Sequence, residues 1–183
     1  MSDQKLAPRF IVLIGLVLIT AMSRILPHPP NFAPIGAMAL FGAAYFRKPL
    51  IGLLVTIAAL AISDIVLNNT IYAAFETNFQ WAVYLSFGLI FLLGYFLLKK
   101  VSFKNVLLGA VSASVIFFLV SNFGHFLSPF SALPKNAAGL IGTYASGLPM
   151  FGFTLAGDLF YCAALFGSFE LMKQQFPVLS FAK

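Results

Sequence analysis

Six apolar stretches occupy most of this 183-residue chain, and they constrain its fold more than any other feature. A helix needs about 20 mainly apolar residues to cross the hydrocarbon core of a bilayer. Stretches of about this length lie near residues 10–27, 32–47, 49–67, 80–98, 105–127 and 150–172. The sequence therefore predicts an all-α integral membrane protein. Its six transmembrane helices would form one compact bundle, a single transmembrane domain over residues 1–183.

The distribution of basic residues gives this bundle an orientation. If the chain crosses the membrane six times from an inner N-terminus, nine of the eleven Lys and Arg residues fall on the inner side. These nine are Lys5, Arg9, Arg47, Lys48, Lys99, Lys100, Lys104, Lys173 and Lys183, whereas Arg24 and Lys135 lie at the outer side. An excess of Lys and Arg in cytoplasmic loops sets the orientation of bacterial membrane proteins. We therefore expect a multi-pass protein of the bacterial inner membrane with both termini in the cytoplasm.

Composition narrows the classes of function. Hydrophobic residues make up 61% of the chain and charged residues 9%, whereas soluble domains have about 45–50% and about 25%. The net charge of +6 is therefore attributed to Lys and Arg beside anionic lipid head groups, and no nucleic-acid partner is expected. A single cysteine supports neither a disulfide framework nor a Cys-based metal cluster. We expect no metal site and no cofactor.

Polar residues inside the apolar stretches carry the main functional signal. A charged residue at mid-membrane costs about 2.5–3.5 kcal/mol on insertion scales, so such residues normally have a partner or line a cavity. In the predicted topology most of them lie in the outer half of the bundle; Glu170 is an exception, because it lies near the inner end and close to Lys173. An outward-opening cavity explains this distribution. Its predicted substrate-binding residues are Arg24, His28, Asn31, Asp64, Asn122, His125 and Asp158.

Each of these residues also has a structural interpretation. Arg24 and Asp64 could form a neutralising pair that fixes helix packing without any ligand. Asn122 could bond a neighbouring backbone carbonyl, and Asp158 could cap or pack a helix. The sequence leaves these alternatives open.

Two segments have no simple assignment as spans or loops. The stretch 32–47 is bounded by Pro34 and by Arg47-Lys48, so we predict a helix that is either short or partly re-entrant. The segment 128–149 is long enough for a short helix lying at the membrane surface. Together with the proline-rich loop 26–34, it would form a lid that orders over a bound ligand.

Known enzyme signatures are absent from the sequence. It contains no HExxH, GxSxG, Walker or GxGxxG motif, and we therefore expect a protein that is not an enzyme. Active uptake by such a chain would depend on a partner with ATPase activity or on an ion gradient.

The segment from Arg24 to Gly42 resembles the opening signature of a family of bacterial six-span membrane proteins. The resemblance covers most of the chain, continuing through Ser63-Asp64, Ser121-Asn122-Phe123-Gly124, Leu148-Pro149 and Thr154-Leu155-Ala156-Gly157-Asp158-Leu159. That family is more distantly similar to the S components of energy-coupling factor (ECF) transporters. S components are small six-helix proteins that bind vitamins or metal ions near the outer face. They usually pair with a transmembrane coupling subunit and two ATPases.

The resemblance implies uptake of a vitamin-type micronutrient, with cobalamin as the leading candidate. The implied partners are the lipid bilayer, the small-molecule substrate and an ECF-type coupling subunit with its ATPases. Many S components carry an Ala-xxx-Ala docking pattern on the first span. Here that pattern occurs instead at Ala39 and Ala43, on the second, so a transporter that works alone stays an alternative. The rival interpretation is an accessory or structural subunit of a larger membrane complex.

Overall fold

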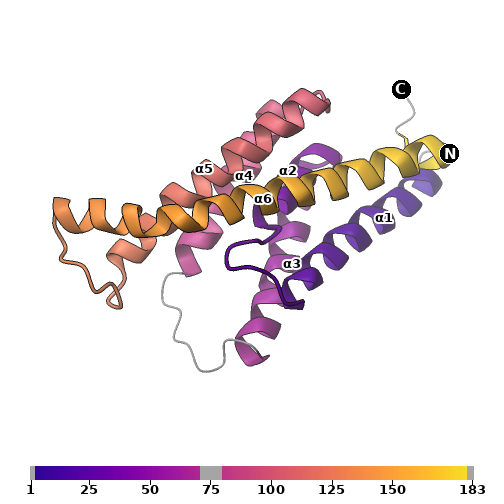
Figure 1. The fold of residues 1–183 in the computed structure, drawn as a ribbon. Coiled ribbons are helices and arrows are strands. Elements are labelled where there is room, and N and C mark those ends of the chain that lie inside the picture. Colours follow the sequence, from indigo (N-terminus) through magenta and orange to yellow (C-terminus); the bar gives the residue numbers. More distant parts are fainter. Residues whose placement is uncertain (1–2, 71–79, 181–183) are drawn as a thin grey trace.

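The computed structural model describes residues 3–70 and 80–180, and every regular element in these ranges is a helix (Figure 1). The elements are α1 (Asp3–Met22), the short 3-10 helix η1 (Ser23–Ile25), α2 (Ile35–Tyr45), α3 (Pro49–Thr70), α4 (Gln80–Leu97), α5 (Phe103–Leu127), α6 (Ala137–Gln175) and the short 3-10 helix η2 (Pro177–Leu179). The predicted all-helical class is thus confirmed for the described residues.

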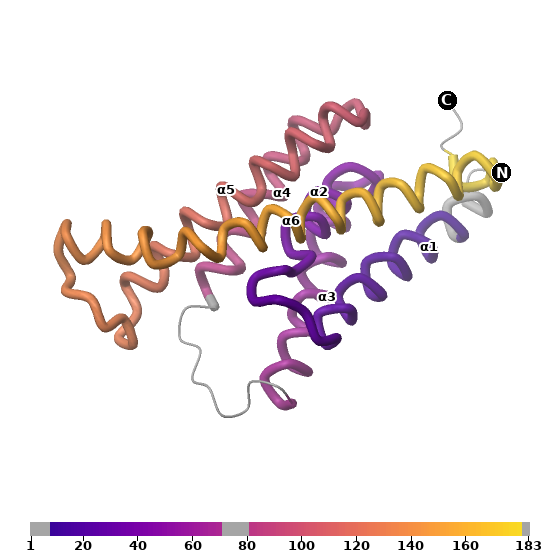
Figure 2. Tube along the Cα trace, in the orientation of Figure 1, coloured from indigo at the N-terminus to yellow at the C-terminus, as the bar shows by residue number. Residues whose placement is uncertain are grey.

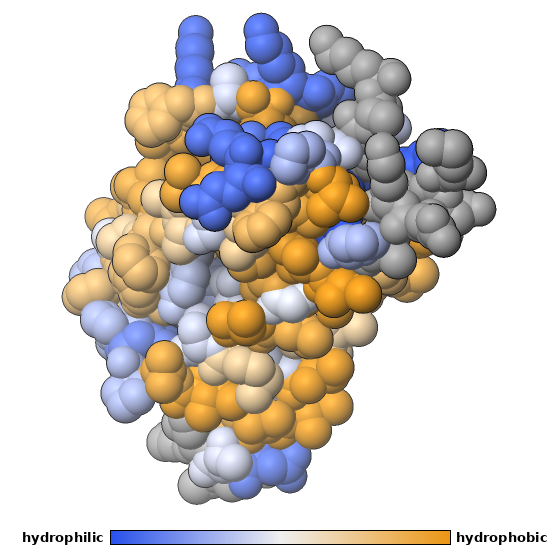
Figure 3. Space-filling model, turned by 90° about the vertical axis from the view of Figure 1, so that its right-hand side faces the viewer, coloured by the Kyte–Doolittle hydropathy of each residue, from blue (hydrophilic) through white to orange (hydrophobic). Residues whose placement is uncertain are grey.

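Four of these helices, α1, α3, α5 and α6, are long and apolar enough to cross a membrane. Many of their large apolar side chains are exposed, including Ile11, Leu50 and Ile65. In Figure 3 apolar side chains fill much of the middle of one face, and hydrophilic ones gather toward its upper and lower ends. These features are those of a helical membrane protein. Six spans are not confirmed, because α2 and α4 are shorter.

The chain connects its helices at two ends of the bundle (Figure 2). We call the end that carries η2 and the first described turns of α1 the terminal end, since these two elements contact each other. The other end, which carries η1 and the loop 26–34, is called the loop end. The loop folds back from the end of α1 toward α6 before α2 begins.

Helix α2 is the shortest α-helix and lies at the centre of the bundle (Figure 1). Nine of its eleven residues are buried, and it packs against α1, α3, α4, α5 and α6. Eleven residues extend about 16 Å, roughly half of the ~30 Å hydrocarbon core. The helix predicted at 32–47 is thus the short one of the two predicted alternatives, a buried helix over Ile35–Tyr45 that is too short to cross a membrane alone.

Small residues let α2 lie close to its neighbours. A Cβ added at Gly42 would lie 2.6 Å from Thr56 Cγ2 on α3, and one added at Gly94 on α4 would lie 3.0 Å from Ala43 Cβ. Ala39 is fully buried. The Ala39 and Ala43 pattern therefore serves packing inside the bundle.

Helix α6 is longer than the sequence predicted. It runs over 39 residues, from Ala137 to Gln175, with Pro149 inside it. The predicted span 150–172 and the separate surface helix within 128–149 are both corrected, because residues 137–149 form the first part of the same helix. Proline normally interrupts a helix, which placed the predicted start too late. The true start is marked by Asn136, whose side-chain oxygen accepts from Gly139 N at 3.0 Å.

Substitution of Gly52 tests the close contact between α2 and α3. A Cβ there would lie 2.6 Å from the backbone oxygen of Gly42 and 3.0 Å from Phe46 Cβ. We expect Gly52→Ala to destabilise the protein by about 1–3 kcal/mol through overpacking, which thermal unfolding in mild detergent would detect. The control is Gly15→Ala on α1, where an added Cβ meets nothing within 4 Å. Equal stability of the two variants would contradict the packing described here.

Candidate functional site

The proline-rich loop is shaped by a tight turn at its centre. Phe32 N donates to Pro29 O at 3.1 Å, and Asn31 has a φ of 63°. Among non-glycine residues, asparagine tolerates this left-handed conformation well, which suits it to the third position of such a turn. The turn brings Phe32 and Ala33 against α6 at Gly157, where an added Cβ would lie 3.0 Å from Ala33 N.

Two adjoining cavities lie beside this loop. The first has a volume of about 140 Å³ and is lined by Arg24, His28, Asn31, Ala33, Ile35, Gly36, Leu67, Phe117, Thr154 and Asp158. The second has a volume of about 200 Å³ and is lined by Asn31, Phe117, Phe118, Ser121, Asn122, His125, Gly147, Met150, Phe151 and Thr154. Asn31, Phe117 and Thr154 line both cavities. The two cavities therefore lie side by side at the loop end.

Six of the seven predicted binding residues lie at these cavities. Arg24, His28, Asn31 and Asp158 line the first, and Asn31, Asn122 and His125 line the second. Asp64 lines neither cavity and lies behind Arg24. The sequence analysis missed Thr154, although its position four residues before Asp158 places both on one face of a helix.

Arg24 and Asp64 form the ion pair that the sequence left open as an alternative. Arg24 Nη1 lies 2.6 Å from Asp64 Oδ1 and donates to Ser63 Oγ at 2.5 Å. The other carboxylate oxygen, Asp64 Oδ2, accepts from Tyr84 OH at 2.8 Å. The pair therefore ties η1 to α3 and α4, and its two charges cancel at the wall of the first cavity.

Asp158 caps the N-terminus of α2 from a different helix. Its side chain is buried on α6, and Ser114 Oγ of α5 donates to its Oδ2 at 2.7 Å. The backbone of Gly36 and Ala37, in the first turn of α2, faces the same carboxylate. A Cβ at Gly36 would collide with this carboxylate, so only glycine fits there.

This contact supplies a cap that α2 does not have in its own sequence. The residue at the N-cap position is Pro34, which makes no side-chain capping bond. The first N–H groups of a helix need acceptors, and a negative charge there is favoured by the helix dipole. The capping role left open for Asp158 is therefore present in the structure.

The second cavity has a polar wall on α5 and aromatic walls on α5 and α6. Asn122 Nδ2 donates to Phe118 O at 2.8 Å, one turn earlier in its own helix. Phe118 also packs edge-on against Phe151, with ring centroids 5.3 Å apart. His125 lies one turn after Asn122 and is exposed. This arrangement offers hydrogen-bonding groups on one side and flat apolar surfaces on the other.

His28 completes the first cavity from the loop. Its Nε2 lies 3.1 Å from Arg24 O, and its Nδ1 lies 2.9 Å from Pro29 O. Both contacts are to backbone carbonyls, so the ring is held against the loop while it lines the cavity. Within the described residues, no three His, Cys, Asp or Glu side chains come together to hold a metal ion.

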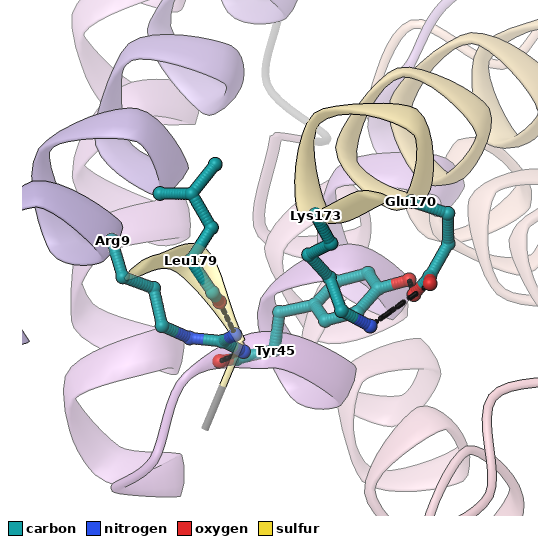
Figure 4. Close-up of polar contacts among 5 residues, drawn as sticks. All are labelled: Arg9, Tyr45, Glu170, Lys173 and Leu179. Atoms are coloured by element: carbon teal, nitrogen blue, oxygen red, sulfur yellow. Dashed lines mark hydrogen bonds and ion pairs between the residues drawn. The ribbon is translucent and has the colours of Figure 1, made fainter. Parts of the chain in front are cut away.

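A second polar cluster, centred on a buried arginine that the sequence did not single out, lies at the terminal end (Figure 4). Arg9 was predicted only as an inner-side residue, but its side chain is buried. Its Nη2 donates to Tyr45 O at 3.0 Å, and its Nη1 donates to Leu179 O of η2. The guanidinium also lies 5.1 Å from the centre of the Phe169 ring.

The same cluster joins α2 to α6 through Tyr45. Tyr45 OH donates to Glu170 Oε1 at 2.6 Å, and Lys173 Nζ lies 2.9 Å from both oxygens of Glu170. Glu170 and Lys173, which lie close together in the sequence, thus form an ion pair. Since Tyr45 is the last residue of α2, Arg9 gives the C-terminus of that helix a cationic partner, as the helix dipole favours.

Comparison with known proteins places the chain in a family. The family of unknown function DUF6580 matches residues 4–179, and the chain belongs to it. Searches of curated proteins and of solved structures found no match.

Removal of the Asp158 carboxylate tests the cap on α2. We expect Asp158→Ala to lower thermal stability by about 1–3 kcal/mol for each donor left without an acceptor. Asp158→Asn keeps one oxygen and should be milder, and Ser114→Ala removes only one donor and should be the mildest. Unfolding curves in one detergent would rank the three variants. Wild-type stability of Asp158→Ala would show that the carboxylate does not hold α2.

Proposed function

We propose that this member of the DUF6580 family is a substrate-binding membrane protein that takes up a small, vitamin-type micronutrient. The observation that carries the proposal is the convergence of polar side chains on two adjoining cavities at one end of an apolar bundle. They come from η1, the loop 26–34, α5 and α6. Concave sites with apolar walls and a few convergent polar groups are typical of small-molecule binding.

The charges around the first cavity favour a neutral polar ligand. Arg24 and Asp64 neutralise each other, and the Asp158 charge meets the N-terminus of α2 and the Ser114 hydroxyl. An uncharged ligand group could hydrogen bond with Asn31 at this cavity, beside the His28 ring. Burial of an unpaired ligand charge would be much less favourable.

The second cavity favours a flat or apolar group on the same ligand. Phe117, Phe118 and Phe151 contribute aromatic surface, and Asn122 and His125 contribute polar edges. A ligand with a polar head in the first cavity and a ring in the second would use both walls. Many vitamins combine these two features.

Ligand size separates the candidates within this class. The two adjoining volumes, about 140 and 200 Å³, together reach only the lower end of the ~300–1,000 Å³ usual for ligand pockets. A compact vitamin suits them better than cobalamin does. Cobalamin, the leading candidate from the resemblance to S components, would require the loop 26–34 to move outward.

Uptake would require motion of the bundle and a source of energy. The buried residues of α2 lie beyond the first cavity and leave no polar route along this helix. We therefore propose an S-component-like mechanism, in which the bundle moves as a body and an ECF-type coupling subunit with ATPases supplies the energy. The proposed location is the bacterial inner membrane, with the termini cytoplasmic and the loop end outside.

One observation favours the rival function of accessory subunit in a larger complex. Arg24, Asp64 and Asp158 all make contacts inside the protein. If these contacts were their only role, the cavities would be a by-product of the packing. Identification of bound molecules and partners separates the two functions.

Native mass spectrometry of the protein in mild detergent is the test of binding. We expect a retained small molecule of vitamin size, which can be identified and then titrated back. Thr154→Val removes a hydroxyl at both cavities and should weaken affinity by about 0.5–1.5 kcal/mol, the net worth of one hydrogen bond. Thr143→Val is the matched control, because Thr143 also donates to the carbonyl four residues earlier on α6 but lines neither cavity.

The outcomes distinguish the two functions. A molecule that is lost or weakened in Thr154→Val, but kept in Thr143→Val, supports the binding function. A stable stoichiometric complex with large partner subunits and no small molecule would favour the accessory function. Equal affinity in both variants would show that the described cavities are not the binding site.

A further inference from the structure

A third cavity lies on the other side of the molecule's centre, between α5 and α6 toward the terminal end. Its volume is about 540 Å³, and its walls are mainly apolar. From α6 it is lined by residues from Leu159 to Glu170, and from the α4–α5 turn and α5 by residues from Val101 to Ala110. In Figure 1 the two helices cross and then diverge on this side. We call this cavity the α5–α6 groove.

The length of the groove along α6 is close to the thickness of one membrane leaflet. The rise from Leu159 to Glu170 along α6 is about 16 Å, roughly half of the ~30 Å hydrocarbon core. Its deep end is apolar, with Leu159, Cys162 and Ala110, whereas Ser102 and Glu170 lie at its rim. An apolar interior with a polar rim matches the length and polarity of a lipid acyl chain below its head group.

The volume fits a hydrocarbon chain better than a full helix. A helix is about 10–12 Å wide with its side chains, so it would fill 540 Å³ within about 7 Å, little more than one turn. A single hydrocarbon chain is much thinner and can extend along the whole groove. Ala163 and Gly167 on α6 are exposed and have small or no side chains, so they leave the groove open. Nothing lies within 4 Å of the position of an added Cβ at Gly167.

The rim is rich in positive charge. Lys99, Lys100 and Lys104 are exposed in and beside the α4–α5 turn that forms one rim. On the other rim, the negative charge of Glu170 is paired with Lys173. Basic residues near a membrane surface attract anionic lipid head groups.

We propose that the α5–α6 groove binds one anionic phospholipid, with an acyl chain between the helices and its head group near Lys100 and Lys104. The lipid would fill the space left where α5 and α6 diverge. This site is separate from the cavities at the loop end and does not depend on the proposed uptake function.

The test is native mass spectrometry of the full chain offered phosphatidylglycerol or phosphatidylcholine with identical acyl chains. We expect phosphatidylglycerol to be retained preferentially, with about a fivefold loss of that preference for each lysine removed in Lys100→Gln and Lys104→Gln. Gly167→Phe should fill the groove and abolish retention of both lipids. Gly152→Phe is the matched control, since Gly152 is also an exposed α6 glycine with open space around it, but lies outside the groove.

Several results would overturn the proposal. These are equal retention of the two lipids by the natural protein, unchanged retention in Gly167→Phe, and a dimer or protein partner that Gly167→Phe removes. Thermal unfolding checks that Gly167→Phe and Gly152→Phe are equally folded. If Gly167→Phe is unstable, Ala163→Leu fills the same groove with a smaller side chain and should lower retention in the same direction.

Discussion

The structure depends on the need to satisfy both ends of one short helix inside an apolar bundle. Helix α2 has eleven residues, most of them buried, and contacts all five other α-helices. No water is available in hydrocarbon for unpaired backbone groups, so its ends require partners from the protein. The Asp158 carboxylate of α6 lies against the first turn, and Arg9 of α1 donates to the last carbonyl. Each charge has the sign that the helix dipole favours, and through these contacts the two long helices hold α2 in place.

The candidate site follows from this arrangement. Because α2 starts only at Ile35, the chain must cover the distance from η1 in an irregular loop, and that loop forms a wall of both cavities at the N-terminus of α2. The carboxylate that caps α2 lies at the same place. A ligand there would touch the loop, the cap and α5 together. Binding could thus be linked to movement of α2 against α6, which is the contact that any passage through the bundle must change.

Sequence patterns predicted the helical class and which polar residues lie near one another, but not how those residues are used. The Arg24–Asp64 pair and the Glu170–Lys173 pair follow from depth and helical spacing, and both are present. The cap by Asp158 and the clamp by Arg9 join residues far apart in the chain, so no local pattern reveals them. Pro149 led to a wrong predicted start for the last helix, because α6 begins after the Asn136 cap and continues through the proline. For α2, the apolar run including its flanks was nearly span-length, whereas the helix stops at Tyr45 before Arg47.

In the proposed function, the cavities at the loop end open to the outside of the cell. The most direct measurement is thiol labelling in whole cells with a membrane-impermeant maleimide. Leu26→Cys places a thiol on the exposed part of the loop, Lys100→Cys places one in the α4–α5 turn, and the natural Cys162 is buried. We expect Leu26→Cys to be labelled in intact cells and Lys100→Cys to be labelled only after the cells are opened. Labelling of Leu26→Cys only in opened cells would contradict an outward-facing site.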